Sequence, residues 1–191
     1  MLFLCPELLP YYVNLGNIYR EAGYLSEAGA CYEAGLSLCK AFPIDAPLSK
    51  AALHMNYAKL CIRQGRRQAA LTSANLAMDI LKRERGIAPT WTASLLESFA
   101  ILSAQEGRHE DELSYAEKAI SIYETVLGKE HPRTAVSYNN KACALMALGR
   151  LSEARECLEK ARSALETIVP SNHQFFRKTL QNLSRLGLAQ K

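Results

Sequence analysis

The chain has 191 residues, of which 49% are hydrophobic and 22% charged, and its formal net charge is +4. Seven prolines and ten glycines are too few for a collagen-like or disordered chain, and no stretch of about 18 apolar residues predicts a membrane span. The charge is far below the basic excess of a dedicated nucleic-acid binder. We therefore expect neither membrane insertion nor nucleic-acid binding.

The six cysteines indicate a reducing compartment. They are spread along the chain without a Cys-x-x-Cys pair, whereas disulfide scaffolds have denser cysteines in smaller chains. The start of the chain is apolar but lacks the basic segment and the cleavage site of a signal peptide. These features predict free thiols and a cytoplasmic protein.

Glycines at a fixed interval divide the chain into repeats. Gly23, Gly65, Gly107 and Gly149 are each 42 residues apart, and each follows an apolar helical stretch and precedes a polar, alanine-rich one. A glycine in this place ends a helix in the left-handed conformation that it adopts at little cost. Small residues recur with the same period and predict close helix crossings. One such column holds Gly16, Ala58, Ala100, Ala142 and Ser184, and another holds Gly35, Ala77, Ala119 and Ala161.

These signals predict four helix pairs and a final helix. In the first pair, Tyr12, Leu15, Gly16 and Tyr19 share one helix face. Prolines in the first turn of a helix mark the joins between pairs. The last helix is amphipathic and would cover the apolar end of the array. The expected helices, in chain order, cover residues 8–22 and 25–42, 47–64 and 67–85, 90–106 and 109–127, 133–148 and 151–168, and 173–188.

The N-terminal end has an apolar cluster in place of such a cap. Its members are Leu2, Phe3, Leu4, Leu8 and Leu9. The sequence leaves three alternatives open: the cluster packs back on the first repeat, the chain continues a longer array, or the cluster is a surface for self-association.

The spacing Tyr12-x2-Leu15-Gly16-x2-Tyr19, followed by Ala28-x3-Tyr32, closely resembles the tetratricopeptide repeat, whose pattern is W-x2-L-G-x2-Y and then A-x3-F in 34 residues. The longer period resembles the kinesin-light-chain type, as does the run LGKEHPRTAVSYNNKA over residues 127–142. The resemblance implies an all-α, right-handed superhelical solenoid. It would form a single domain over 1–191, with repeats at about 8–47, 48–89, 90–132 and 133–172 and a capping helix at about 173–188.

Three residues depart from the repeat pattern. Arg133 stands where the subtype has an acidic residue, and Glu112 stands where the other repeats have alanine. Lys141 occupies an expected core column, so its ammonium must reach solvent along its stem or pair with a carboxylate. The other members of that column are Leu15, Tyr57, Phe99 and Leu183.

Nothing in the sequence favours an enzyme. There is no Gly-rich phosphate loop, nucleophile elbow or His-Glu-x-x-His motif. The four histidines are far apart in sequence, and metal ligands at short spacings are missing. We therefore expect a non-catalytic protein with no cofactor, no metal and no small-molecule substrate.

The resemblance implies that the first helix of each repeat lines a concave groove for a protein or peptide partner. Lys59, Arg63 and Arg20 would favour an acidic peptide there. The candidate partner-binding residues are Asn14, Asn17, Arg20, Met55, Asn56, Lys59, Arg63, Glu97, Ser98, Ile101, Asn139 and Asn140.

One column of this groove is rich in amides: Asn14, Asn56, Ser98, Asn140 and Asn182. An amide ladder could bond the main chain of an extended peptide, or the amides could bond neighbouring helices or be copies of one ancestral repeat. The sequence leaves both interpretations of the amide column open. The expected function is an adaptor or scaffold that binds a peptide or helix, and the alternative is a scaffold that self-associates, as a homodimer, through its N-terminal end.

Overall fold

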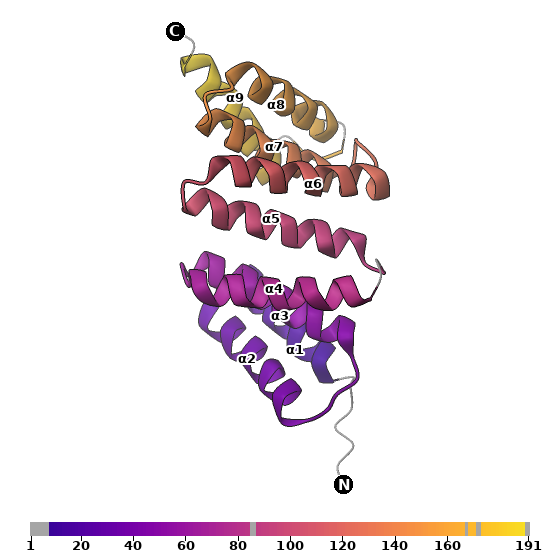
Figure 1. The fold of residues 1–191 in the computed structure, drawn as a ribbon. Coiled ribbons are helices and arrows are strands. Elements are labelled where there is room, and N and C mark those ends of the chain that lie inside the picture. Colours follow the sequence, from indigo (N-terminus) through magenta and orange to yellow (C-terminus); the bar gives the residue numbers. More distant parts are fainter. Residues whose placement is uncertain (1–7, 85–86, 167, 171–172, 190–191) are drawn as a thin grey trace. The chain divides into compact units, whose positions relative to one another are not determined.

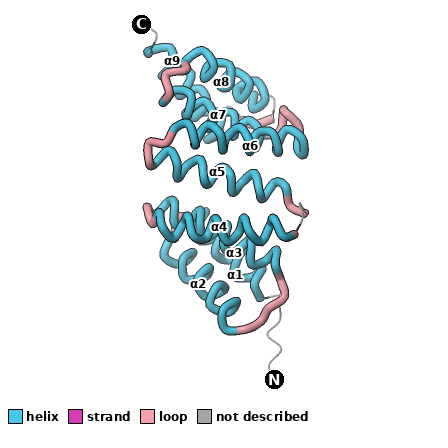
Figure 2. Tube along the Cα trace, viewed as in Figure 1, coloured by secondary structure: helices cyan, strands magenta, loops and turns pink. Residues whose placement is uncertain are grey.

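The computed structural model describes residues 8–84, 87–166, 168–170 and 173–189, which form nine α-helices and no strand (Figure 1, Figure 2). The predicted all-α fold of helix pairs is confirmed, and every helix boundary lies within two residues of the expected one. The helices are α1 (Leu8–Ala22), α2 (Leu25–Ala41), α3 (Pro47–Arg63), α4 (Arg67–Arg83), α5 (Pro89–Gln105), α6 (His109–Leu127), α7 (Pro132–Ala147), α8 (Leu151–Glu166) and α9 (Gln174–Ala189).

The helices belong to two compact units. Unit 1 spans Met1–Ala88 and contains the pairs α1/α2 and α3/α4, and unit 2 spans Pro89–Lys191 and contains α5/α6, α7/α8 and α9. Within each unit every helix packs on its neighbour in sequence (Figure 1). The expectation of one domain over residues 1–191 stays a prediction.

The periodic glycines end the first helix of each pair, as predicted. Their φ angles are positive: 91° at Gly23, 71° at Gly65, 70° at Gly107 and 75° at Gly149. This conformation is costly for any residue with a Cβ. The joins between pairs are also as expected, because α3, α5 and α7 each begin at a proline.

The columns of small residues lie where helices cross closely. Gly35, Ala77, Ala119 and Ala161 are all buried, as are the first four members of the column that begins at Gly16. Ser184, the last member of that column, is exposed. No second helix follows α9 in the described residues, so nothing there packs on this position.

The expected core column was wrong at Leu15, whose side chain is 45% exposed. At two other members the column faces the second helix of the preceding repeat: Tyr57 Oη donates to Glu33 Oε1 of α2 at 2.7 Å, and Lys141 Nζ lies 2.9 Å from Glu117 Oε1 of α6. No described helix precedes α1, so Leu15 has no such partner. Lys141 takes the predicted solution of pairing with a carboxylate.

The final helix packs on α7 and α8, as a cap would. Leu186 is fully buried in the core of unit 2, and Phe176 and Leu183 pack against the same core. Leu180 is exposed. Three of the four large apolar residues Phe176, Leu180, Leu183 and Leu186 therefore lie on the buried face of the amphipathic helix.

The cysteines of the described residues are free thiols, as expected: Cys31, Cys39, Cys61, Cys143 and Cys157. Cys5 lies outside the described residues, as do Leu2, Phe3 and Leu4 of the N-terminal cluster. Among the described helices, none has the length and apolar character needed to cross a membrane.

Candidate functional site: a cavity lined by α5, α6, α7 and α9

A cavity of about 370 Å³ opens in unit 2 between α5, α6, α7 and α9. Alanines of α5 and α6 give it an apolar wall, and polar side chains come from all four helices. Its lining residues are Glu97, Ala100, Ile101, Ala104 and Gln105 of α5, Glu112 and Ala116 of α6, Ser137, Asn140 and Cys143 of α7, and Lys178 of α9. Three of the predicted partner-binding residues, Glu97, Ile101 and Asn140, therefore lie together.

Glu97 is held in place by neighbours on α6 and α7. Its carboxylate accepts hydrogen bonds from Ser137 Oγ at 2.6 Å and from Tyr123 Oη at 3.3 Å. Burial and this carboxylate raise the pKa of Tyr123 to about 12. Arg133 Nη1 also donates to Tyr123 Oη, at 3.3 Å. Arg133, the basic residue that departs from the subtype, therefore helps to hold Glu97 through their shared partner Tyr123.

The second carboxylate of the cavity, Glu112, is buried at the start of α6 and contacts His109 Nδ1 at 2.9 Å. This contact gives the buried carboxylate a polar partner and explains how the repeat accommodates an acidic residue in an alanine position. Cys143, on the facing helix, has a pKa raised chiefly by burial. Its thiol is consequently protonated near neutral pH and is a weak nucleophile.

Two other candidates of unit 2 form side-chain hydrogen bonds within the protein, Ser98 inside its own helix and Asn139 between helices. Ser98 is buried, and its Oγ donates to the carbonyl of Ser94 in its own helix at 3.1 Å. Asn139 is buried, and its Oδ1 accepts from Asn182 Nδ2 of α9 at 3.0 Å. Neither lines the cavity.

The candidates on α1 differ in exposure. Asn14 is exposed, and Asn17 is half-buried, with its Oδ1 accepting from Tyr32 Oη at 2.7 Å. Arg20 is half-buried and lies 3.5 Å from the carboxylate of Glu21.

The candidates on α3 range from buried to exposed. Met55 and Asn56 are buried, and Asn56 Nδ2 donates to the carbonyl of Ala52 at 2.9 Å. Lys59 is half-buried, and Arg63 is exposed, with its Nη1 donating to the carbonyl of Arg20 at 2.9 Å. Among the candidates of unit 1, Asn17, Asn56 and Arg63 thus form side-chain hydrogen bonds within or between their own helices.

The amide column has different surroundings at each position. Asn56 and Ser98 bond their own helix, Asn182 bonds α7, Asn14 is exposed and Asn140 lines the cavity. Bonds within and between helices therefore account for part of the column, and Asn140 is the member that lines the cavity.

Sequence reasoning missed Ser137 and Lys178 as members of the site. Ser137 lies on the face next to Asn140, one turn earlier on α7, and this neighbourhood could have nominated it. Lys178 belongs to α9, which we interpreted only as a cap. Among the residues that the structure describes, no group of three or more His, Cys, Asp or Glu side chains could hold a metal ion.

Two family models, both described as tetratricopeptide repeat, match residues 9–42 and 91–167. The chain belongs to the tetratricopeptide-repeat family. Its first match covers the pair α1/α2 and its second most of α5 to α8. No curated protein sequence matches the chain. Tetratricopeptide repeats stack into arrays with extended binding surfaces, so the chain has the fold of a protein-interaction module.

Solved tetratricopeptide-repeat structures show the same fold. BtubC (BKLC) from P. vanneervenii is 20% identical with a TM-score of 0.80, covering 97% of this chain and 74% of BtubC. TPR-like repeats of kinesin light chain type from Podosopora anserina are 21% identical with a TM-score of 0.75, covering 98% and 89%. The apo form of RapI is 20% identical with a TM-score of 0.79, covering 95% and 64%. The predicted likeness to kinesin-light-chain repeats is confirmed.

Proposed function

We propose that this tetratricopeptide-repeat chain is a non-catalytic adaptor or scaffold of the cytoplasm that binds an extended peptide or a helix of a partner protein. The observation that carries the proposal is the unit 2 cavity, which Glu97, Ile101 and Asn140 line together. Its volume lies within the range of small ligand sites. A side chain of the partner would enter it.

The wall chemistry supports a peptide ligand. Ile101 is 43% exposed, and Ala100, Ala104 and Ala116 offer apolar surface to a side chain. The half-buried amide of Asn140 can donate to and accept from a peptide main chain that would otherwise lose water unpaired.

The experiment fills the cavity with a side chain that the same fold already accepts. Two periods earlier in the sequence, unit 1 has Gly16 and Tyr32 where unit 2 has Ala100 and Ala116. The double variant Ala100→Gly/Ala116→Tyr should therefore fold and place a tyrosine ring in the cavity. Circular dichroism would check the helix content.

Partner binding would be read by photocrosslinking in cells, with a benzophenone side chain at Ile101. The control position is Val126 of α6, which has a similar exposure of 45% and does not line the cavity. We expect a crosslinked protein from position 101 that is lost in the filled variant. Equal crosslinking from both positions, or an unchanged product in the folded filled variant, would refute the proposal.

A second candidate function, self-association, is favoured by an exposed apolar stripe on α1. Leu8, Tyr11, Leu15 and Ile18 follow helical spacing on one face and are 37%, 72%, 45% and 64% exposed. Sedimentation velocity of the wild type and of Tyr11→Lys/Ile18→Lys tests it. A dimer that becomes a monomer in the variant supports self-association, and a wild type that stays monomeric at high concentration refutes it.

A further inference from the structure

Unit 1 contains a groove of about 830 Å³ between α2 and α4, next to α3, and we name it the α2–α4 groove. Lys40 of α2 and Lys50 and His54 of α3 line it. Leu36 of α2 and Leu76 of α4 add apolar surface, and Leu76 is 46% exposed. The groove therefore combines cations with apolar side chains, and none of its lining residues was among the predicted partner-binding residues.

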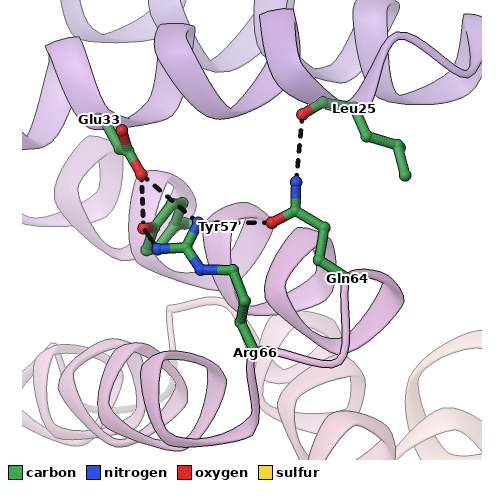
Figure 3. A network of polar contacts seen from close by, with 5 residues as sticks. All are labelled: Leu25, Glu33, Tyr57, Gln64 and Arg66. Carbon is green, nitrogen blue, oxygen red and sulfur yellow. Dashed lines mark hydrogen bonds and ion pairs between the residues drawn. The ribbon is translucent and has the colours of Figure 1, made fainter.

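Glu33 is the acidic residue among those that line the groove, and its charge is already compensated. Figure 3 shows its carboxylate beside Tyr57 and Arg66: Tyr57 Oη donates to Glu33 Oε1 at 2.7 Å, and Arg66 Nη1 lies 3.6 Å from the same oxygen. Arg66 Nη2 also donates to Tyr57 Oη at 2.9 Å, and Gln64 accepts from Arg66 (Figure 3). This network occupies the Glu33 carboxylate.

The lysines of the groove have no such compensation. Within the part of the chain that the structure describes, no carboxylate lies within ion-pair distance of Lys40 or Lys50. The Nδ1 atom of His54 is buried and has no hydrogen-bond partner among the described residues. Burial and the nearby Lys40 lower the pKa of His54, so its ring is neutral at pH 7 and carries one N–H donor. An anion in the groove would compensate the two ammonium groups.

We propose that the α2–α4 groove binds an acidic segment of a partner protein, with its carboxylates at Lys40 and Lys50 and an apolar side chain against Leu36 and Leu76. Charge complementarity selects this occupant, because two uncompensated ammonium groups attract carboxylates and repel basic segments. The site is separate in its residues from the unit 2 cavity. It would bind its segment whether or not that cavity binds a peptide.

The test uses a short fluorescein-labelled peptide of alternating Glu and Leu and the full chain, with fluorescence anisotropy as the readout. Lys40→Glu/Lys50→Glu should weaken binding by about tenfold or more, since two attractive charges become repulsive. The same variant should gain affinity for a matched Lys and Leu peptide. Leu76→Ser should also weaken the Glu and Leu peptide, because it removes apolar contact.

The matched control is Lys82→Glu/Lys129→Glu, which changes the net charge equally at exposed lysines outside the groove. It should leave the affinity within about twofold of the wild type. Equal weakening by both double variants would show non-specific charge attraction and would overturn the proposal. An NMR titration of the wild type needs no variant: the peptide should shift the His54 ring signals, and unshifted His54 signals at saturation would also overturn it.

Discussion

The crossing of α1 and α2 requires that residue 16 have no side chain. A Cβ built on Gly16 would lie 2.8 Å from both Cδ1 and Cζ of Tyr32, which is closer than Cβ contacts in proteins come. The Tyr32 ring has no room to withdraw, because it is fully buried and its Oη is bonded to Asn17. We predict that Gly16→Ala destabilises the protein.

The magnitude follows from two opposing effects. Overpacking a core costs about 1–3 kcal/mol, and a rigid, anchored ring places Gly16→Ala in the upper half of that range. Replacing glycine by alanine inside a helix contributes about 1 kcal/mol in the other direction. The expected result is a net loss of about 1–2 kcal/mol of unfolding free energy.

Gly29→Ala is the matched control in the same unit. Gly29 is also helical and buried, but its added Cβ would meet only Leu60 Cδ2, at an ordinary 3.6 Å. The higher helix propensity of alanine then dominates, and we expect Gly29→Ala to stabilise the protein by about 0.5–1 kcal/mol. Urea unfolding followed by circular dichroism would show the two midpoints moving in opposite directions at equal m-values. A Gly16→Ala midpoint at or above that of the wild type would refute the reasoning.

For three further changes the structure determines the direction of the effect on stability or titration. Lys141→Leu should leave the melting temperature unchanged or slightly higher, since the partly exposed pair with Glu117 is worth about 0–1 kcal/mol; a loss above about 1 kcal/mol would contradict this. Gly149→Ala should cost about 1–2 kcal/mol in urea unfolding because φ is 75° there, and Gly149→Asn should cost less. Burial and Glu33 raise the pKa of Tyr57 from 10.0 to about 12, so the stability that its neutral phenol contributes is present below pH 10 and is lost as the pH rises toward 12. Tyr57→Phe should remove one late-ionising tyrosine from the absorbance titration at alkaline pH, and an unchanged titration would speak against the raised pKa.

The fold could be predicted from the sequence because its signals are local. A glycine that ends a helix and a proline that begins one depend on the backbone of a few residues, and both kinds of position were correct. Errors arose where the outcome depends on a neighbour distant in sequence. Leu15 follows the helix pattern of Tyr57, but the helix that would cover it is missing from the described residues.

The site was harder to predict because a column in the sequence does not repeat its surroundings. Asn56 and Asn140 are equivalent by period, yet Asn56 is buried and bonds the carbonyl of Ala52, whereas Asn140 lines a cavity. Ser98, in the same column, bonds its own helix as Asn56 does. Spacing shows which residues share a face, but the neighbouring side chains decide whether that face is open.

The difference between the two units can be traced to three pairs of residues two periods apart. Where unit 1 has Tyr32 and Arg20, unit 2 has Ala116 and Ala104, and both alanines line the cavity. Removing an aromatic ring and a long side chain from equivalent positions opens the space beside Asn140. The third pair follows from the packing, because Tyr32 requires a glycine at position 16, whereas Ala116 allows the larger Ala100 opposite. The helix crossing that Tyr32 packs in unit 1 therefore corresponds to an open cavity in unit 2.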